Sequence, residues 1–286
     1  MIEEDDAVGH ILLQPMPSEL PAESLTLIES LKSPRCYGGD VTHVDLIETH
    51  VSWVLLAGEF AYKLKKPVDF GFVNFTTLDR RKFFCEEELR LNRRLAAHLY
   101  LAVVPITGTL ENPTLDGDGE PLEWAVKMRQ FSQDQLLSHV VEQGRLQPAH
   151  VDQLAQVLAE FHQRIAIAEE NDPRGFGSPE QILDACWGNF RAQFDQDGDE
   201  RGIPTGPVNV PPELIAAEKP LVELLSWTRT QAHKLQSRFI EHRRAGAIRE
   251  CHGDAHLGNA LLDNGIVHLF DGIDFNEQLR WIDVIS

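Results

Sequence analysis

The chain has 286 residues, of which 42% are hydrophobic and 8% aromatic, as expected of a globular protein with one large domain or two lobes. Its 45 acidic and 26 basic residues give a net charge of -19, which excludes a general attraction to nucleic acid. No apolar run reaches the ~20 residues of a membrane helix, and the acidic N-terminus is unlike a targeting signal, so we expect a cytoplasmic protein without membrane contact.

The strand and helix patterns divide the chain into three parts. Residues 1–40 carry acids, prolines and one short helical pattern, and are expected to form a leader. Residues 41–131 contain five strand patterns and one helix, which Thr76 is expected to cap and which should end near Ala97. Residues 132–286 are mainly helical. The strand patterns lie at 44–50, 51–56, 60–66, 103–110 and 122–131, and the turn-rich segment 111–121 separates the last two.

Polar residues that can act in acid–base chemistry or bind a metal are concentrated in the segment CHGDAHLGN (251–259) and the hairpin pattern that follows it. An Asn-Gly turn at 264–265 is a strong two-residue hairpin signal, and folding the strands about it places Asn259 and Asp271 at the same open end. Paired oxygens from these residues, next to Asp254 as a proton acceptor, suit phosphoryl transfer from a Mg-nucleotide. The net charge of -19 also favours a cation beside any bound nucleotide.

The segment resembles the His-Gly-Asp-x-x-x-x-Asn loop of the aminoglycoside phosphotransferase and choline kinase type of small-molecule kinase. The resemblance implies that Asp254 orients and deprotonates an acceptor hydroxyl and that His252 braces the loop. It also implies that Asn259 and Asp271 hold Mg2+, with ATP or GTP as the phosphoryl donor. Further stretches look like an uncharacterised bacterial branch of that superfamily, often fused to a C-terminal P-loop ATPase domain: THVSWVLLAGEFAYKLKKPVDFGFVNF, CEEELRLNRRLAAHLYLAVVP and FNEQLRWIDV.

The implied fold is α+β and bilobal, a protein kinase-like fold with the nucleotide between the lobes. In such folds a lysine on the third strand touches the nucleotide phosphates and a carboxylate of the next helix holds it. Lys63 is the best match for this lysine, and Lys65, two residues on and on the same face, is the alternative. Taken alone, Lys63 would equally fit an ordinary solvated strand lysine.

Three successive glutamates, 86–88, compete for the role of the helix carboxylate. Helical spacing places Glu88 in the apolar stripe that faces the protein, and a buried acid requires a partner. Glu87 instead groups with Arg80 and Arg94, which predicts a surface ion pair. Glu88 would also be satisfied by Arg81 or by the neighbourhood of Arg90, without any functional lysine. The apolar residues at -4, +3 and +7 from Glu88 are Phe84, Leu91 and Leu95.

The phosphate cradle and the adenine contact are the other expected parts of the nucleotide site. The chain has no Gly-x-Gly-x-x-Gly loop, so backbone N–H groups and the hydroxyls of Thr49 and Ser52 are the candidates for the phosphates. The backbone near Met128 to Gln130 is expected to face the adenine edge. His268 is interpreted as an ordinary core or surface histidine, and Asp274 as one of the residues that pin the segment after Asp271.

Two other functions compete with a kinase. A nucleotide-binding pseudokinase would keep the fold without turnover. A metal-dependent phosphoesterase would use Gly253-Asp254-Ala255-His256, but the further His and Asp clusters of two-metal sites are missing from the sequence. We also expect the chain to be shortened at its C-terminus, because the apolar pattern in RWIDVIS has no stop signal, and any P-loop domain, fused or partnered, to lie outside it. The acceptor is expected to be a small-molecule hydroxyl of unknown identity.

Overall fold

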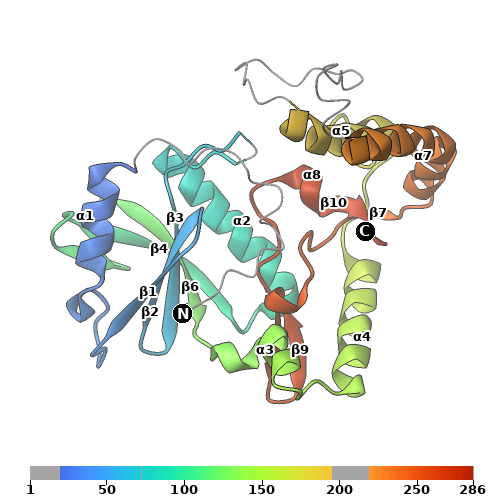
Figure 1. Ribbon diagram of the computed structural model, residues 1–286. Coiled ribbons are helices and arrows are strands. Elements are labelled where there is room, and N and C mark those ends of the chain that lie inside the picture. Colours follow the sequence, from blue (N-terminus) through green and yellow to red (C-terminus); the bar gives the residue numbers. More distant parts are fainter. Residues whose placement is uncertain (1–19, 72, 195–218, 286) are drawn as a thin grey trace. The chain divides into compact units, whose positions relative to one another are not determined.

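The computed structural model describes residues 20–71, 73–194 and 219–285, whose helices and strands form a mixed α+β fold (Figure 1). The predicted α+β class is therefore confirmed. The described chain divides into two compact units: a sheet unit, with residues 20–164 and 252–280, and a helical unit, with residues 165–251 and 281–285. Residues 1–19 of the expected leader lie outside the description. Within the described ranges, no helix combines the length and apolar character needed to cross a membrane.

The sheet unit contains six antiparallel strands in the order β1-β2-β3-β6-β4-β5. The expectation of five strands was wrong by one, because the turn-rich segment 111–121 contains the short strand β5. Its first residue, Pro113, is tolerated because β5 is an edge strand. The bounds are Val44–Glu48 (β1), Ser52–Ala57 (β2), Phe60–Lys65 (β3), Tyr100–Gly108 (β4), Pro113–Leu115 (β5) and Glu123–Arg129 (β6).

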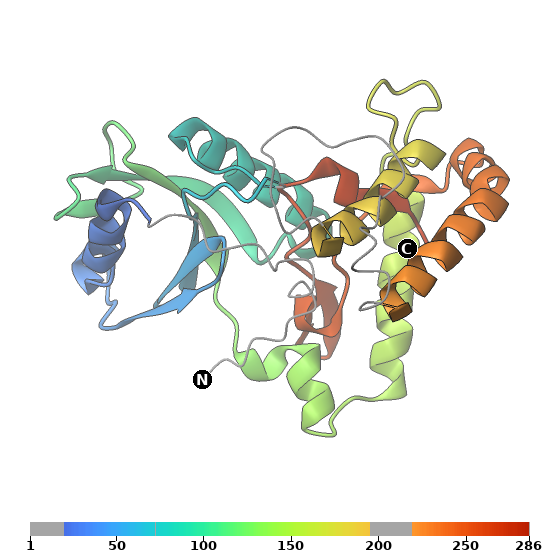
Figure 2. The ribbon, with the colours of Figure 1, turned by 45° about the horizontal axis from the view of Figure 1, so that its top comes forward.

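Helices cover both faces of this sheet (Figure 2). Helix α1 (Ala22–Leu31) buries three aliphatic residues against the face that carries Tyr62 and Leu64 of β3. Because side chains alternate along a strand, Ala61, Lys63 and Lys65 lie on the opposite face, where α2 (Leu78–Ala96) packs. Strand β3 thus presents apolar residues to α1 and two lysines to α2.

The start of α2 differs from the prediction by one residue. Thr77, rather than Thr76, is the N-cap: its backbone is extended, and its hydroxyl accepts a hydrogen bond from the Arg80 backbone N–H at 3.3 Å. The Thr76 hydroxyl donates instead to Asn74 Oδ1 at 2.8 Å. With two adjacent threonines, the tertiary path of the preceding loop decides which one is extended, and the local pattern alone does not.

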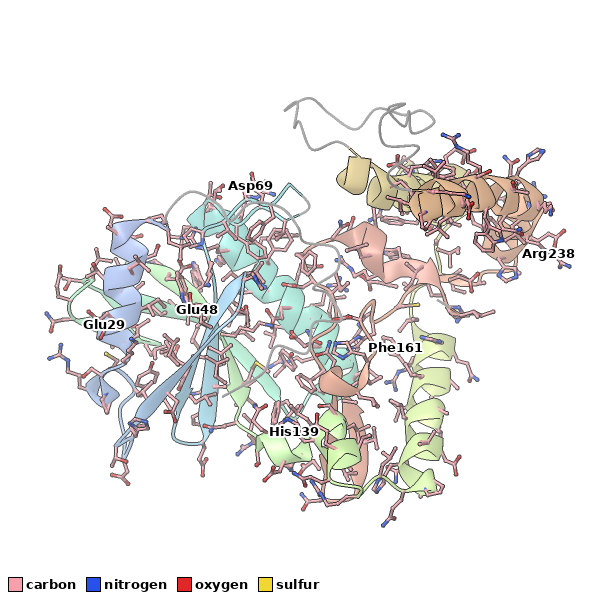
Figure 3. All side chains as sticks on the ribbon, viewed as in Figure 1. Glu29, Glu48, Asp69, His139, Phe161 and Arg238 are labelled. Carbon is pink, nitrogen blue, oxygen red and sulfur yellow. The ribbon has the colours of Figure 1, made fainter. Side chains whose placement is uncertain are left out.

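The sheet unit continues in short helices and the predicted hairpin. Asn264 and Gly265 both have positive φ, 49° and 82°, so the hairpin turns as the Asn-Gly pattern predicts. Phe161 of α4, labelled in Figure 3, is buried beneath the guanidinium of Arg94, 5.0 Å from its ring centroid. The elements are η1 (Pro34–Cys36), η2 (Gln133–Gln135), α3 (Leu137–Glu142), α4 (Pro148–Arg164), η3 (Leu257–Asn259), β8 (Ala260–Asp263), β9 (Ile266–Leu269) and α8 (Glu277–Arg280).

The helical unit combines helices α5 (Pro179–Phe194) and α7 (Lys219–Arg244) with a two-stranded sheet. Strand β7 (Ile248–Glu250) pairs antiparallel with β10 (Trp281–Asp283). The Trp281 ring stacks on Phe176, with the two centroids 5.1 Å apart. The sequence patterns did not predict this small sheet, because its strands have three residues each and lie about thirty residues apart.

Candidate functional site

Two lysines of β3 share one buried carboxylate of α2. Glu88 is 1% exposed, and its two oxygens face different partners: Oε2 accepts a hydrogen bond from Lys65 Nζ at 2.9 Å. Oε1 lies 3.0 Å from Lys63 Nζ. This distance makes an ion pair, but the angle does not allow a hydrogen bond. Sequence spacing left Lys63 and Lys65 as alternatives, and both contact Glu88.

Each lysine also contacts an aspartate from the segment after the hairpin. Lys63 Nζ lies 2.6 Å from Asp271 Oδ1, and Lys65 Nζ lies 2.5 Å from Asp274 Oδ2. The charge network thus contains two ammonium and three carboxylate groups, with an excess of negative charge when all are ionised. Asp274, which the sequence suggested would pin the segment after Asp271, makes this buried contact with Lys65.

Burial and charge act against each other on the pKa values of this network. Burial favours the neutral form of Glu88, but Lys63 and Lys65 outweigh it and lower the pKa of the carboxyl to about 2. Burial also opposes the charge of Lys63, whereas Asp271 and Glu88 together raise its pKa well above the usual range. Burial raises the pKa of Asp274 despite the adjacent Lys65. Glu88 is therefore the firmly ionised centre of the network.

The backbone at Asp271 is held in a conformation that few residues adopt. Asp271 has φ of 58°, in the left-handed region, and its N–H donates to the Tyr100 hydroxyl at 3.1 Å. The next N–H, of Gly272, donates to Asn92 Oδ1 at 2.8 Å. A Cβ on Gly272 would lie 3.0 Å from the carbonyl oxygen of His252, so the close approach favours glycine.

The loop before the hairpin is braced by a buried histidine. His252 Nδ1 accepts a hydrogen bond from the Asp254 N–H at 3.3 Å, and its Nε2 therefore donates to the Phe270 carbonyl at 2.9 Å. Burial lowers the pKa of His252, which agrees with a neutral ring that has one donor and one acceptor. Through this ring the backbone of Asp254 is connected to the residue before Asp271.

Asp254 and Asn259 face one another across the loop. Asn259 Nδ2 donates to Asp254 Oδ2 at 2.9 Å and to its backbone oxygen at 3.1 Å. The Phe270 N–H donates to the Asn259 carbonyl at 3.0 Å, which places Asn259 and Asp271 at the open end of the hairpin as predicted. In the described part of the chain, Oδ1 of Asp254, Oδ1 of Asn259 and Oδ2 of Asp271 accept no hydrogen bond, and the Asp271 side chain is 42% exposed.

The residues expected at the phosphates form a closed turn between β1 and β2. The Thr49 and Ser52 hydroxyls lie 2.9 Å apart, and the Ser52 N–H donates to Thr49 Oγ1 at 3.0 Å. Lys66 Nζ donates to the Thr49 carbonyl at 2.5 Å and pairs with Glu48 at 2.7 Å. Both hydroxyls are thus engaged within the turn, and Ser52 is 2% exposed. Their role toward phosphate stays a prediction.

The strand end expected at the adenine lies beside an open hollow. The Met128 side chain is buried, and the following N–H groups, of Arg129 and Gln130, donate to the carbonyls of Leu99 and Glu59 at 2.8 and 2.9 Å. These two donors are committed to protein partners, and an adenine contact here stays a prediction. A hollow of about 520 Å³ is lined by Gly58, Glu59, Arg129, Gln130, Phe131, Ser132 and Gln135.

Long-range partners account for what sequence patterns missed. Glu87 pairs with Arg90 at 2.8 Å and with Arg280 at 3.2 Å. Arg80, one of the partners that helical spacing suggested for Glu87, donates instead to the Asn74 carbonyl at 2.7 Å. Arg81, offered as an alternative partner of Glu88, pairs with Glu123 at 2.7 Å. Among the residues not anticipated are Lys66, Asn92 and Tyr100, and no local signal marks them.

No protein-family model matches the sequence. Curated relatives include uncharacterized proteins of Mycobacterium bovis and of two strains of Mycobacterium tuberculosis, each 29% identical over 247 residues. The matched region covers 86% of this chain but 45% of each relative, so the chain spans less than half the length of these curated relatives. Their names state no activity, and the function has to be argued from the side chains described above.

Proposed function

We propose that the chain is a Mg-dependent phosphotransferase, which moves the γ-phosphoryl group of ATP or GTP to a hydroxyl of a small molecule. The observation that carries the proposal is the position of Lys63, which contacts both Glu88 and Asp271, although Asp271 lies 208 residues further along the chain. A strand lysine held by a helix glutamate, beside an aspartate after a catalytic loop, is the arrangement of kinase-like nucleotide sites.

The sheet supports a kinase-like fold for the sheet unit. Three strands that precede α2 in the chain lie side by side, β6 and β4 complete the order β1-β2-β3-β6-β4, and the lysine lies on the third strand. The helix that follows this strand in the chain is α2, and it supplies Glu88. The resemblance to aminoglycoside phosphotransferases and choline kinases rests on the same residues. Fold alone does not specify an acceptor.

The donor set at the open end of the hairpin fits Mg2+. Asn259 and Asp271 offer amide and carboxylate oxygens that accept no hydrogen bond in the described part of the chain, and oxygen ligands are what Mg2+ prefers. The excess negative charge of the network also favours a cation. Bound there, Mg2+ would neutralise charge on the nucleotide phosphates.

The protein groups then divide the remaining tasks. Asp254 accepts the proton of the acceptor hydroxyl while the acceptor oxygen bonds to the γ-phosphorus and the bond to the β-phosphate oxygen breaks. His252, hydrogen-bonded to the Asp254 N–H and the Phe270 carbonyl, keeps the loop at a fixed distance from the hairpin. Lys63 binds the phosphates, and Glu88 keeps it charged and oriented.

Nucleotide binding and turnover are the tests. Thermal unfolding with Mg2+ and ATP or GTP should show a rise in Tm, and a screen with labelled ATP against hydroxylated metabolites should reveal an acceptor. Asp254→Asn should retain the Tm shift and lose turnover, and Asp152→Asn, an exposed change on α4, should keep both. Absence of any shift at millimolar nucleotide would overturn the proposal.

Two other outcomes correspond to the competing functions. A Tm shift without turnover of any acceptor would indicate a nucleotide-binding pseudokinase. Hydrolysis of phosphoesters without a need for nucleotide would indicate a phosphoesterase built on Asp254 and His256, whose Nε2 lies 3.6 Å from Asp254 Oδ2. A P-loop ATPase domain, fused or partnered and outside this chain, stays part of the proposal.

A further inference from the structure

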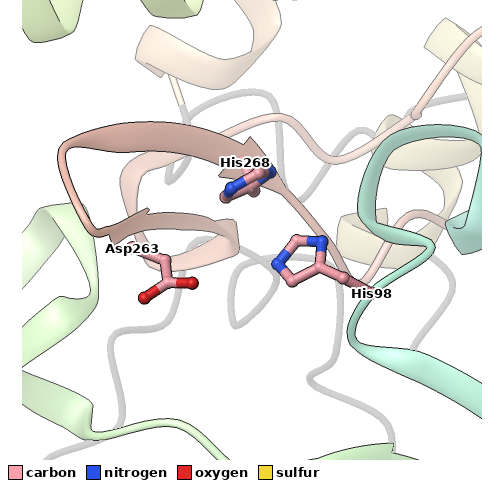
Figure 4. A group of neighbouring side chains, drawn as sticks. All are labelled: His98, Asp263 and His268. Carbon is pink, nitrogen blue, oxygen red and sulfur yellow. The ribbon is translucent and has the colours of Figure 1, made fainter.

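Two histidines and an aspartate meet on one face of the β8–β9 hairpin, where Asp263 adjoins the turn and His268 lies one residue from the open end. Figure 4 shows His98, in the turn after α2, facing His268 of β9, with Asp263 on the neighbouring strand β8. One ligand atom from each of the three lies within 4.8 Å of the others. The two imidazole rings are 4.2 Å apart at their centroids and tilted by 54°.

The fold itself brings these side chains to one place. His268 pairs with Leu261 across the hairpin, and Asp263 lies two residues after Leu261, so strand alternation puts Asp263 and His268 on the same face. Helix α2 ends at Ala96, and the bond from the Leu99 N–H to the Ala96 carbonyl turns the chain there, which carries His98 to that face. The cluster therefore joins two segments that are far apart in the sequence.

The ligand atoms are available, and the aspartate is held in place. Among the described residues, neither the His98 ring nor the His268 ring makes a hydrogen bond. Oδ1 of Asp263 accepts hydrogen bonds from Gln135 Nε2 and Asn264 Nδ2, both at 3.1 Å. Amides that orient a carboxylate in this way are the usual outer shell of a metal ligand.

We propose that His98, Asp263 and His268 form a binding site for a transition-metal dication of the Zn2+ type. Two imidazole nitrogens and one carboxylate oxygen suit Zn2+ and exclude Mg2+ and Ca2+, which select oxygen ligands. Tetrahedral zinc needs ligand atoms about 3.3 Å apart, and rotation of the exposed His98 side chain closes the gap from 4.8 Å. Water completes the coordination. The absence of a Cys-x-x-Cys pair from the sequence argues against a cysteine-based zinc site, and this site uses no thiolate.

A metal at this position would tie the α2–β4 turn to the hairpin. The segments so joined also carry the charge network, because α2 supplies Glu88 and the open end of the hairpin leads to Asp271. Metal binding would therefore stabilise the native state and raise Tm. The inference does not depend on the proposed phosphotransferase function, because none of the three ligands belongs to that site.

Metal titration of the full chain tests the site. Calorimetry with Zn2+ at neutral pH should show one ion per chain, with a Kd of about 1 μM or below, and Co2+ should give the visible absorption of a tetrahedral complex. His98→Ala and His268→Ala should each weaken Zn2+ binding at least about tenfold. His43→Ala is the matched control, since His43 is exposed and lies 2.8 Å from Asp45, and it should leave binding unchanged.

Three results would overturn the inference. Zn2+ binding weaker than about 100 μM would leave the two rings as a simple stacking contact. Equal weakening by His98→Ala and His43→Ala would indicate diffuse binding by surface histidines. Retention of tight binding in His98→Asn, a change of an exposed side chain that leaves the strands intact, would show that the ion lies elsewhere.

Discussion

The open end of the β8–β9 hairpin and one of its faces present different cation ligands within a few residues of one another. At the open end, Asn259 and Asp271 offer oxygen atoms, and Lys63 lies 2.6 Å from Asp271. On one face of the hairpin, Asp263, next to the turn, is accompanied by two imidazoles, those of His98 and His268. Both places carry a carboxylate, so the groups beside it decide which ion is preferred. Further oxygen ligands and an ammonium group favour a Mg-nucleotide, whereas imidazole nitrogens favour a Zn2+-type ion.

The two ends also differ in how firmly the fold fixes them. At the open end, buried partners hold the backbone, with Tyr100 and Asn92 accepting hydrogen bonds from Asp271 and Gly272. At the closed end, the chain turns through Asn264 and Gly265, and none of the described residues lies within 4 Å of a Cβ added at Gly265. A substitution at the open end therefore disturbs packed structure, whereas one at the closed end disturbs mainly the turn itself.

Removal of Glu88 should produce the largest effect, because it leaves two buried lysines without their shared partner. We expect Glu88→Ala to lower the free energy of unfolding by about 3–5 kcal/mol, measured by urea denaturation. Glu86→Ala is the control on the same helix: Glu86 is half exposed and lies 3.9 Å from Lys82, so its loss should cost under about 0.5 kcal/mol. Equal losses from the two variants would contradict a network centred on Glu88.

Two variants should distinguish the proposed Mg-nucleotide site from the proposed Zn2+ site. Asp271→Asn should abolish the stabilisation by Mg2+ and ATP, about 2.7 kcal/mol at a hundredfold excess over Kd, and leave the Zn2+ effect intact. His98→Ala should do the reverse. Thermal unfolding with each ligand measures both. If either variant removes both effects, the two proposed sites do not bind their ions independently.

Local chemistry explains which parts of the fold and site were predictable. The Asn-Gly turn encodes the hairpin because both residues tolerate positive φ, and helical spacing identifies Glu88 because its apolar neighbours recur on one face. The pairing of Lys63 with Asp271 was not predicted, because the residues lie 208 positions apart. Periodicity and turn signals extend over a few residues and carry no information about such contacts.

The same limit explains the errors. Strand β5 is three residues long, which is too short for an alternating pattern, and the pairing with β4 creates it. Glu87 pairs with Arg280 as well as with its helix neighbour Arg90, because the chain returns to α2 after the hairpin. The His98 cluster was missed for a similar reason, since its two histidines lie on segments that only the tertiary fold brings together.

Acid should weaken the protein through Glu88, with Asp274 acting in the opposite direction. The pKa of Glu88 is lowered to about 2 in the folded state, so its contribution is complete above pH 4.5 or so and is lost as the pH falls toward 2. The pKa of Asp274 is raised, so protonation of Asp274 favours the folded state as the pH falls. Glu88 alone would contribute a loss of about 3 kcal/mol, and protonation of Asp274 makes the net loss smaller.

Urea denaturation at a series of pH values measures this balance. Glu88→Gln should flatten the acid limb of the stability curve, and Asp274→Asn should steepen it, because the opposing contribution disappears. Glu86→Gln, the control on the exposed face of α2, should leave the shape of the curve unchanged. Parallel curves for Glu88→Gln and the unchanged protein would show that carboxyl groups outside the network dominate acid unfolding.

The smallest expected effect compares one glycine from each end of the hairpin region. Gly253, in the loop before Asp254, and Gly265, in the turn, have nearly the same φ, 86° and 82°. Both positions therefore impose the same backbone cost on alanine, about 1 kcal/mol. They differ in space, because a Cβ at Gly253 would lie 2.8 Å from the Leu279 carbonyl and 3.3 Å from Ile273, whereas Gly265 is open.

Gly265→Ala should therefore lower the free energy of unfolding by about 1 kcal/mol, through backbone strain alone. Gly253→Ala should lower it by about 2 kcal/mol, because the neighbouring backbone must also move. Denaturant midpoints measure both. The variants should differ in binding as well: displacement of the loop at Gly253 moves Asp254 and weakens the Mg-nucleotide response, whereas Gly265→Ala spares it. If both variants lose the same stability and keep the same Tm shift with Mg-nucleotide, the backbone near the open end is as easily displaced as the turn. The inferred difference in rigidity between the two ends would then be wrong.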